Sequence, residues 1–508
     1  MLIQKAWQFL RSWRADLRAR AAKFFVTREV VRTLQLTHAQ ELSITPRNEW
    51  ALVRQKQVEE IQAVRDGKTF DIVDRRSWCC SEDSEILTRE GFKGPNDLSE
   101  DDEVATLNPD TNELEYYRPK SIFRQQYSGK MIHFKGRGFN CLVTPDHRMI
   151  GRWKWIHYSD NPKPDKVIGR KALSAVTFAT AAKIAAYQRE YKSNEYGFEV
   201  PFAAKWSGQF PGNYDERTGK ITLDCSYDSG PGTHRWDRDY SPVEVSLWDY
   251  VAFLGIYVAE GGCAGNYQGV DKKSPRPKYI TAMAAAADNK VYDRSAGYRV
   301  SVSQLKTSRH YDRIKQLMSR LPFDFQEETR GGFYSNSRVL HDNVFPCGNT
   351  YTKKVPQFVK DLPPKYIRRF IRWYTRGDGI QRQSGAREGF TTSKQLANDL
   401  QELFIKIGRQ ARIKKGLSSA AQYFADSHPD RCAPKYTVEE NLGRFVGLPK
   451  PETVSYRGLV WCVNVPPNAT ILVRRCGQAV WTGNSYPYLP EALHRLRHKP
   501  TRAEEHAL

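Results

Sequence analysis

The stretch SWCCSEDSEILTREG (residues 77–91) places two adjacent cysteines directly before a segment whose β-branched and apolar residues predict a strand. The chain has nine cysteines, and none of them lie in a CxxC pair. This pattern argues against a zinc site or a disulfide scaffold and indicates a reducing cytoplasm. One member of the pair is therefore either a small core residue or a nucleophile whose partners lie far along the chain.

Length and charge limit the alternatives. The chain has 508 residues, enough for about three domains, and 40% of its residues are hydrophobic. No apolar run is long enough to span a membrane, and the basic N-terminus predicts no secretory signal. A net charge of +22 indicates a large polyanionic partner, most simply a nucleic acid, although basic charge can also serve solubility alone.

The pattern of apolar residues changes several times along the chain. Residues 1–70 carry apolar residues at three- and four-residue spacing, which predicts helices. From Ser77 the pattern shortens to β-like pieces, residues 205–242 are rich in turn formers, and mixed helix and strand follow to about residue 415. A last β segment precedes a helical tail, LPEALHRLRHK (489–499). The sequence thus predicts a small helical protein interrupted by a large insert.

Four sequence blocks resemble, in order, the successive blocks of inteins. They are CCSEDSEILTREGF from Cys79, VTPDH at 143–147, GLVWCVNVPPNATILVRR at 458–475 and VWTGNS at 480–485. In the family the first strand starts about six residues after the nucleophile, which selects Cys79 over Cys80 because Glu85 lies at that spacing. The resemblance places the insert at residues 79–484, between Trp78 and Ser485.

The resemblance implies a nucleophilic role for Cys79, whose thiol would convert the Trp78 peptide bond to a thioester. His147 would protonate the departing nitrogen, with Thr144 and Asp146 holding the imidazole.

The resemblance also implies how the reaction ends. Ser485 would take over the acyl group, and Asn484 would cyclise and cut the chain after itself. An acyl shift would then join residues 1–78 to 485–508. Splicing of this kind is intramolecular and needs no cofactor.

Two positions depart from the usual intein pattern. Gly483 stands where His is usual before the terminal Asn, so cyclisation must draw help from elsewhere or proceed slowly. Cys462 stands where many inteins carry Asp, and a second intein class uses a Cys there as first nucleophile. That class also needs a Trp at position 149, where this chain has Met149, and a Thr near the end, which Thr482 supplies. We therefore expect Cys79 to be the nucleophile and Cys462 to assist it or to be structural.

The insert is longer than a splicing domain alone requires. FLGIYVAEGG (253–262) and FIRWYTRGDG (370–379) resemble the paired LAGLIDADG helices of homing endonucleases. The resemblance implies that Glu260 and Asp378 end these helices side by side and hold Mg²⁺ for double-stranded DNA cleavage, with Gly261 and Gly379 allowing close approach.

The expected architecture is therefore multi-domain: an all-β Hint splicing domain split by an α+β LAGLIDADG endonuclease domain, with mainly helical flanks. The expected segments are 1–78, 79–195, 196–415, 416–484 and 485–508, of which the second and fourth form the splicing domain.

The second endonuclease helix departs from type. Trp373 replaces a small residue at the helix contact, Arg376 replaces an acidic or small one, and the first helix ends in Glu260 instead of Asp. Lys414 is the candidate auxiliary lysine.

Three interpretations of the whole chain stay open. It is a splicing precursor with an active endonuclease, a splicing element with a degenerate insert that only binds DNA, or a basic nucleic-acid-binding protein that does not splice. The host segments are basic and helical in pattern, and no feature identifies their family or partners.

Overall fold

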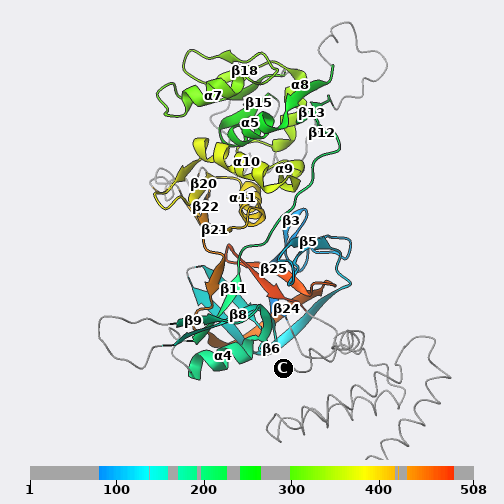
Figure 1. Ribbon diagram of the computed structural model, residues 1–508, viewed down its shortest axis with the longest axis vertical. Coiled ribbons are helices and arrows are strands. Elements are labelled where there is room, and N and C mark those ends of the chain that lie inside the picture. Colours follow the sequence, from blue (N-terminus) through cyan, green and yellow to red (C-terminus); the bar gives the residue numbers. More distant parts are fainter. Residues whose placement is uncertain are drawn as a thin grey trace, which may run out of the picture. The chain divides into compact units, whose positions relative to one another are not determined.

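The computed structural model describes residues 79–136, 138–157, 170–190, 196–225, 241–264, 298–417, 422 and 432–484 (Figure 1). The chain divides into two compact units, Met1–Ser77 with Tyr486–Leu508, and Trp78–Ser485. All described residues belong to the second unit. The helices expected in residues 1–70 and 489–499 lie outside the described residues, as do Trp78 and Ser485.

The described part is largely β, with seven α-helices. It contains two lobes, which Figure 1 shows joined through the sheet that contains β21 and β25. The barrel lobe comprises the described residues of 79–206 and 442–484. The paired-helix lobe comprises those of 207–441.

The barrel lobe is built on a closed barrel of four strands. Its longest pairing joins β6 (Ser121–Gly136) to β24 (Glu452–Asn464), with Asn464 opposite Ser121 and Glu452 opposite His133. The other two strands are β1 (Cys80–Ser81) and β7 (Phe139–Val143). The segments before and after the paired-helix lobe thus share one barrel, and a common apolar core fills it.

Two further sheets surround the barrel. The first contains β8 (Arg148–His157), β9 (Arg170–Leu173), β10 (Thr177–Thr180), β11 (Tyr196–Pro201) and β23 (Phe445–Gly447), with α4 (Ala181–Glu190) beside it. The second contains β2 (Glu85–Thr88), β3 (Gly91–Lys93), β4 (Val104–Leu107), β5 (Leu114–Tyr117), β25 (Thr470–Arg475) and β26 (Gln478–Gly483).

Two long helices form the centre of the paired-helix lobe. α5 (Leu247–Glu260) begins at Ser246, whose side chain accepts from the Asp249 amide, and nearly all of its residues are buried. α10 (Pro364–Gly377) buries one apolar face. The strands around them are β12 (Tyr214–Asp215), β13 (Lys220–Leu223), β14 (Val243–Ser246), β15 (Gly261–Cys263), β16 (Val300–Val302), β17 (Gln326–Glu327), β18 (Phe333–Ser335), β19 (Gly379–Gln381), β20 (Arg387–Thr391), β21 (Gln410–Gly416) and β22 (Lys435–Asn441). The remaining helices are α7 (Tyr311–Met318), α8 (Arg338–Val344), a 3₁₀ turn (Phe345–Cys347), α9 (Gln357–Asp361) and α11 (Lys394–Lys406).

The lobe boundaries differ from the expected segments. β11 pairs with β8 and β23, and its Phe198 and Val200 lie in the barrel core, so the first crossing comes after residue 195. β22 pairs with β20 and β21 and places Val438 in the core around α5 and α10, so the return comes after residue 416. The turn-rich stretch 205–242 contains β12 and β13 as well as loops.

Candidate active sites

The Cys79 amide is held at one end of the barrel. Its N–H donates to Thr144 Oγ1 at 3.0 Å, and the Thr144 N–H donates to Cys79 O at 3.0 Å. This nitrogen belongs to the bond between residues 78 and 79, so Thr144 orients the peptide bond that the expected reaction would break.

The two adjacent cysteines differ in their surroundings. Cys80 faces Trp461 across β1 and β24, which places Cys79 opposite Cys462 in the same register. Burial, and then the neighbouring Cys462, raise the pKa of the Cys79 thiol. Burial, and then Cys141, raise the pKa of Cys80 in the barrel core. The Cys79 thiol therefore keeps its proton near neutral pH and must lose it during an attack.

His147 lies between the two ends of the insert. Its backbone N–H donates to Thr144 O at 3.0 Å, and its ring atom Nε2 lies 2.7 Å from Thr482 Oγ1 on β26. Thr482 Oγ1 also lies 3.1 Å from Arg148 O, to which its hydroxyl donates. The same hydroxyl therefore contacts His147 Nε2 and the Arg148 carbonyl, and the tautomer of His147 decides which of the two atoms at 2.7 Å donates. The expected support from Asp146 is wrong, because this side chain is exposed and makes no hydrogen bond within the described residues.

Asn484 is fully buried just beyond β26. Its N–H donates to Ala469 O at 3.0 Å, and its Nδ2 donates to Val465 O at 3.3 Å. Two carbonyls of the segment 465–469, which precedes β25, therefore hold the backbone and the side-chain amide of Asn484.

Close packing explains why the residue before Asn484 is a glycine. A Cβ at Gly483 would lie 2.7 Å from Arg148 O and 2.9 Å from Arg148 Cβ. Because this approach is closer than ordinary contact, the strand packing excludes the usual histidine at this position. The preceding residue, Thr482, contacts His147 Nε2 through its hydroxyl.

In the paired-helix lobe, α5 and α10 approach closely. A Cβ at Gly255 would lie 2.6 Å from Phe370 O and 2.9 Å from Trp373 Cβ, and one at Gly377 would lie 2.7 Å from Ala259 Cβ. The expected glycines Gly261 and Gly379 instead allow turns at the helix ends, since a Cβ there would meet Tyr257 and Glu388 O respectively. Gly255 thus compensates for Trp373, which sequence reasoning missed.

The close approach brings Glu260 and Asp378 together. Burial, and then Glu260, raise the pKa of Asp378 to about 6, while burial raises the pKa of Glu260. Lys353 lies near both carboxyls, and its charge lowers the pKa of each. Its Nζ donates to Ala259 O at 3.0 Å, and burial lowers its own pKa.

Lys353, and not Lys414, is thus the lysine that the structure places beside the two carboxylates. Lys414 projects from β21 and pairs with Glu439 at the surface. In the sequence, Lys353 directly precedes the stretch KVPQFVKDLPPKYIRRF (354–370), which leads into α10.

The donor set at the helix ends suits a hard divalent cation. Carboxylate oxygens are the ligands that Mg²⁺ prefers, and two mutually repelling carboxylates gain by sharing a cation. No group of three or more His, Cys, Asp or Glu residues that could hold a metal ion occurs in the described ranges.

Basic residues gather around Arg376, two positions before Asp378 in the chain. Arg376 stacks 4.2 Å from the centre of the Trp373 ring, and burial, then Arg313, lower its pKa to about 10. A cavity of about 530 Å³ is lined by Arg309, His310, Arg313, Gln381, Arg382 and Gln383. Such an excess of cations suits a polyanion. None of the described helices is long and apolar enough to cross a membrane.

Comparisons with known proteins give partial likenesses. No family model matches the chain. It is 23% identical over 342 residues to the ATP-dependent Clp protease proteolytic subunit of Chlamydomonas moewusii, covering 66% of this chain and 28% of the relative. It is 23% identical over 477 residues to the DNA-directed RNA polymerase subunit beta C-terminal section of Stigeoclonium helveticum, covering 84% and 38% respectively.

A third curated relative is the ribonucleoside-diphosphate reductase subunit beta of Aquifex aeolicus, 32% identical over 82 residues, covering 16% of this chain and 12% of the relative. The chain thus spans less than two fifths of each of these relatives.

Solved structures similar to this chain include an intein and a homing endonuclease. The AceL NrdHF class 3 split intein has a TM-score of 0.14 and 17% identity, covering 20% of this chain and 77% of that chain. Two structures of the homing endonuclease I-DmoI, one with its target DNA and magnesium, each have a TM-score of 0.24 and cover 39% of this chain and 90% of theirs, at 12% and 14% identity. At these low scores, only the geometry of the sites themselves can support a function.

Proposed function

We propose that the chain is a precursor that excises residues 79–484 autocatalytically and joins Trp78 to Ser485. The observation that carries this proposal is the hydrogen-bond path from the Cys79 amide through Thr144 and His147 to Thr482, two residues before Asn484. This path ties both ends of the expected insert to one loop.

The proposed first step occurs at Cys79. Its sulfur attacks the Trp78 carbonyl carbon, the C–N bond breaks, and the nitrogen gains a proton as the thiol loses one. Thr144 orients the amide, and His147 serves as the proton donor.

The later steps transfer and release the chain. The Ser485 hydroxyl attacks the thioester and frees the Cys79 thiol. The Asn484 side-chain nitrogen then attacks the main-chain carbonyl carbon of Asn484, which breaks the 484–485 peptide bond. The acyl group of Trp78 then moves from the Ser485 side-chain oxygen to the freed Ser485 nitrogen, which gives an ordinary peptide bond. Cys462, opposite Cys79, assists the first step or serves the core.

The comparisons support an insert more than a single enzyme. The three curated relatives carry unrelated names, and each matches this chain over a minority of its own length. A segment inserted into different hosts would produce this pattern.

Intact mass spectrometry of the expressed chain beside an Asn484→Ala form tests the proposal. Splicing predicts two masses in the wild type, one for residues 79–484 and one for residues 1–78 joined to 485–508, and neither in the variant. A single mass of 58.5 kDa in both would reject splicing and favour the interpretation as a nucleic-acid-binding protein.

A second proposed activity is the cleavage of double-stranded DNA by the paired-helix lobe. The close contact of α5 and α10 at Gly255 and Gly377, with two carboxylates at the adjoining ends, favours it. Glu260 and Asp378 would hold Mg²⁺, which when bound supplies Lewis acidity toward a phosphodiester. Lys353 balances the charge of the two carboxylates, and the arginines near Asp378 contact the DNA backbone.

Magnesium-dependent cutting of DNA that encodes the uninterrupted 1–78/485–508 junction tests this activity. Retained binding without cutting would identify the degenerate, DNA-binding insert instead.

A further inference from the structure

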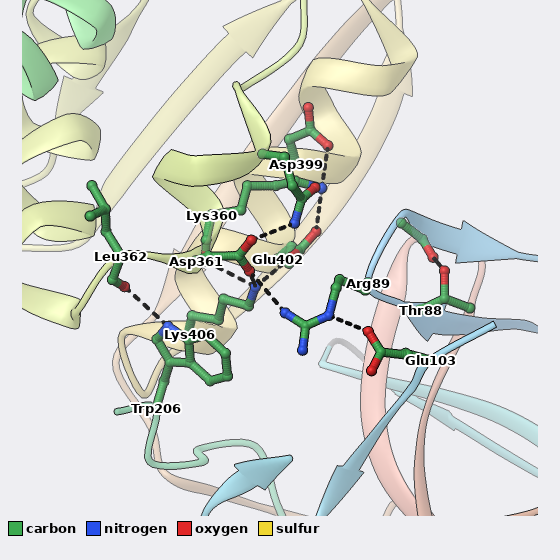
Figure 2. Close-up of polar contacts among 12 residues, drawn as sticks. Thr88, Arg89, Glu103, Trp206, Lys360, Asp361, Leu362, Asp399, Glu402 and Lys406 are labelled. Atoms are coloured by element: carbon green, nitrogen blue, oxygen red, sulfur yellow. Dashed lines mark hydrogen bonds and ion pairs between the residues drawn. The ribbon is translucent and has the colours of Figure 1, made fainter. Parts of the chain in front are cut away.

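The two lobes meet at a polar seam that Figure 2 shows in detail. Arg89, in the turn between β2 and β3, donates to Glu103 Oε2 at 2.6 Å within its own lobe. It also donates to Asp361 Oδ1 at 3.2 Å, at the end of α9 in the other lobe. Trp206, the last residue of the barrel lobe before the crossing, donates from Nε1 to Leu362 O at 3.1 Å.

Behind this seam lies a buried ion network that α11 supplies. Lys406 Nζ lies 2.8 Å from Glu402 Oε1, and both side chains are almost completely buried. Lys360 Nζ lies 3.1 Å from the same carboxylate. The Tyr116 ring, on β5 of the barrel lobe, contacts two cations. Its centre lies 4.5 Å from Arg89 Cζ and 5.3 Å from Lys406 Nζ. The charges of one lobe thus pack against an aromatic ring of the other.

A second contact joins α11 to the hairpin of β25 and β26. The guanidinium of Arg474, on β25, is buried and donates to Glu85 Oε2 at 2.6 Å and to Asn398 Oδ1 at 2.7 Å. Gln401 of α11 accepts from the same guanidinium at 3.2 Å and donates to Gly477 O, in the hairpin turn, at 2.9 Å. Two side chains of α11 therefore accept hydrogen bonds from a buried guanidinium of the barrel lobe.

A third contact is apolar. Ile405 of α11 lies in one buried cluster with Ile150, Leu472 and Trp481 of the barrel lobe. Trp481 directly precedes Thr482, the hydrogen-bond partner of His147. The neighbouring Val480 belongs to the barrel core, so β26 is packed between a core of its own lobe and one that α11 completes.

Strand pairing continues through the same place. β21 follows α11 and pairs with β26 at Arg412 and Gln478, and the Ile413 N–H donates to Gly477 O at 2.9 Å. The sheet that contains the splicing hairpin is therefore continuous with β22, β20 and β19 of the paired-helix lobe.

We propose that α11 is a positioning element for the C-terminal half of the splicing reaction. It holds β26 so that Thr482 stays at His147 and Asn484 stays against Val465 and Ala469. The paired-helix lobe is then an integral part of the splicing fold and not a removable cassette. This inference rests on the proposed splicing function.

The test compares Ile405→Ala and the double variant Asn398→Ala/Gln401→Ala with Lys394→Ala. Lys394 is an exposed residue at the start of the same helix, so its variant controls for general effects of changing α11. Two rates are measured in the full chain by mass spectrometry. One is dithiothreitol-induced release of residues 1–78, which reports thioester formation at Cys79. The other is cleavage after Asn484.

A positioning role predicts at least a tenfold loss in cleavage after Asn484, with less than a threefold change in thioester formation, because β1 and β7 hold Cys79 without α11. Unchanged rates, or an equal loss at both sites, would overturn it. Absence of both cleavages in the wild type would instead reject the splicing function.

Amide hydrogen exchange supplies a readout that does not need splicing. In a Cys79→Ala/Asn484→Ala background, Ile405→Ala should speed exchange in β26 at least tenfold, whereas β6 should stay protected and Lys394→Ala should change neither. Undiminished protection of β26 in Ile405→Ala would overturn the inference whether or not the chain splices.

Discussion

His147 Nε2 lies 2.7 Å from Thr482 Oγ1, although 335 residues separate them in the sequence. This hydrogen bond links the loop that holds the Cys79 amide to the strand that carries Asn484. Under the proposed function, a proton-transfer group placed there would serve both ends of the insert, and the Thr482 hydroxyl would orient its ring.

Thr482→Val should therefore slow cleavage after Asn484 about tenfold, since losing one buried hydrogen bond costs about 1–1.5 kcal/mol. Thr482→Ser keeps the hydroxyl and should retain at least half of the wild-type rate. Time courses of the released C-terminal segment measure both rates. Equal rates for the Val and Ser variants would show that the hydroxyl has no role.

Gly483→His should impair cleavage after Asn484, although His is the usual residue at this position in inteins. The new Cβ would lie 2.7 Å from Arg148 O, and such overpacking destabilises by about 1–3 kcal/mol. Thermal unfolding in a Cys79→Ala/Asn484→Ala background measures the lost stability. A faster reaction in the histidine variant would contradict the steric explanation.

Cys79→Ala should abolish thioester formation, whereas Cys80→Ala should retain it with a modest loss of stability. Both cysteines belong to the barrel core, but Thr144 holds the Cys79 amide, whereas Cys80 neighbours Cys141. Dithiothreitol-induced release of the N-terminal segment measures the difference. The opposite result would shift the start of the insert by one residue.

Magnesium-dependent DNA cleavage should fall as the pH drops through about 6, where the Asp378 carboxyl gains its proton. The folded-state pKa lies above the ordinary 3.8, so protonated Asp378 favours the folded state at low pH, and this stabilisation is lost as the pH rises through about 6. The free energy of unfolding of Asp378→Asn should accordingly exceed that of the wild type by about 1–3 kcal/mol at pH ~8. The gain should shrink toward pH ~4 in urea titrations, and a gain independent of pH would contradict the raised pKa.

Lys353→Met should lower DNA cleavage about a hundredfold and move the acidic limb of its pH profile upward. Lys353 counteracts the rise in the pKa of Asp378, so its removal leaves two buried carboxylates that repel each other. Lys365→Met is the matched control, because Lys365 is exposed at the opposite end of α10. A pH profile that does not move would assign Lys353 a packing role only.

The residues near the chain ends of the insert were predictable because short motifs carry them. Cys79, Thr144, His147 and Asn484 each lie within one recognisable block, and the barrel brings these blocks together. The roles of these residues, and of Ser485 outside the described part, stay predictions.

The contacts between blocks were not predictable. Gly255 faces Trp373, and Lys353 reaches the acidic pair from a loop with no periodic pattern. The pairing of β22 with β20 depends on a tertiary return that no local spacing encodes.

The packing of α11 beneath β26 has a consequence for inheritance. Under the proposed functions, a host that needs its interrupted protein would tolerate mutations of Glu260 or Asp378, since these would end DNA cleavage and leave the junction chemistry intact. By the same proposals, this host would not tolerate loss of residues 394–416, which contain α11 and β21. Selection acting on the host alone would then maintain the fold of a nuclease long after its cutting activity had decayed.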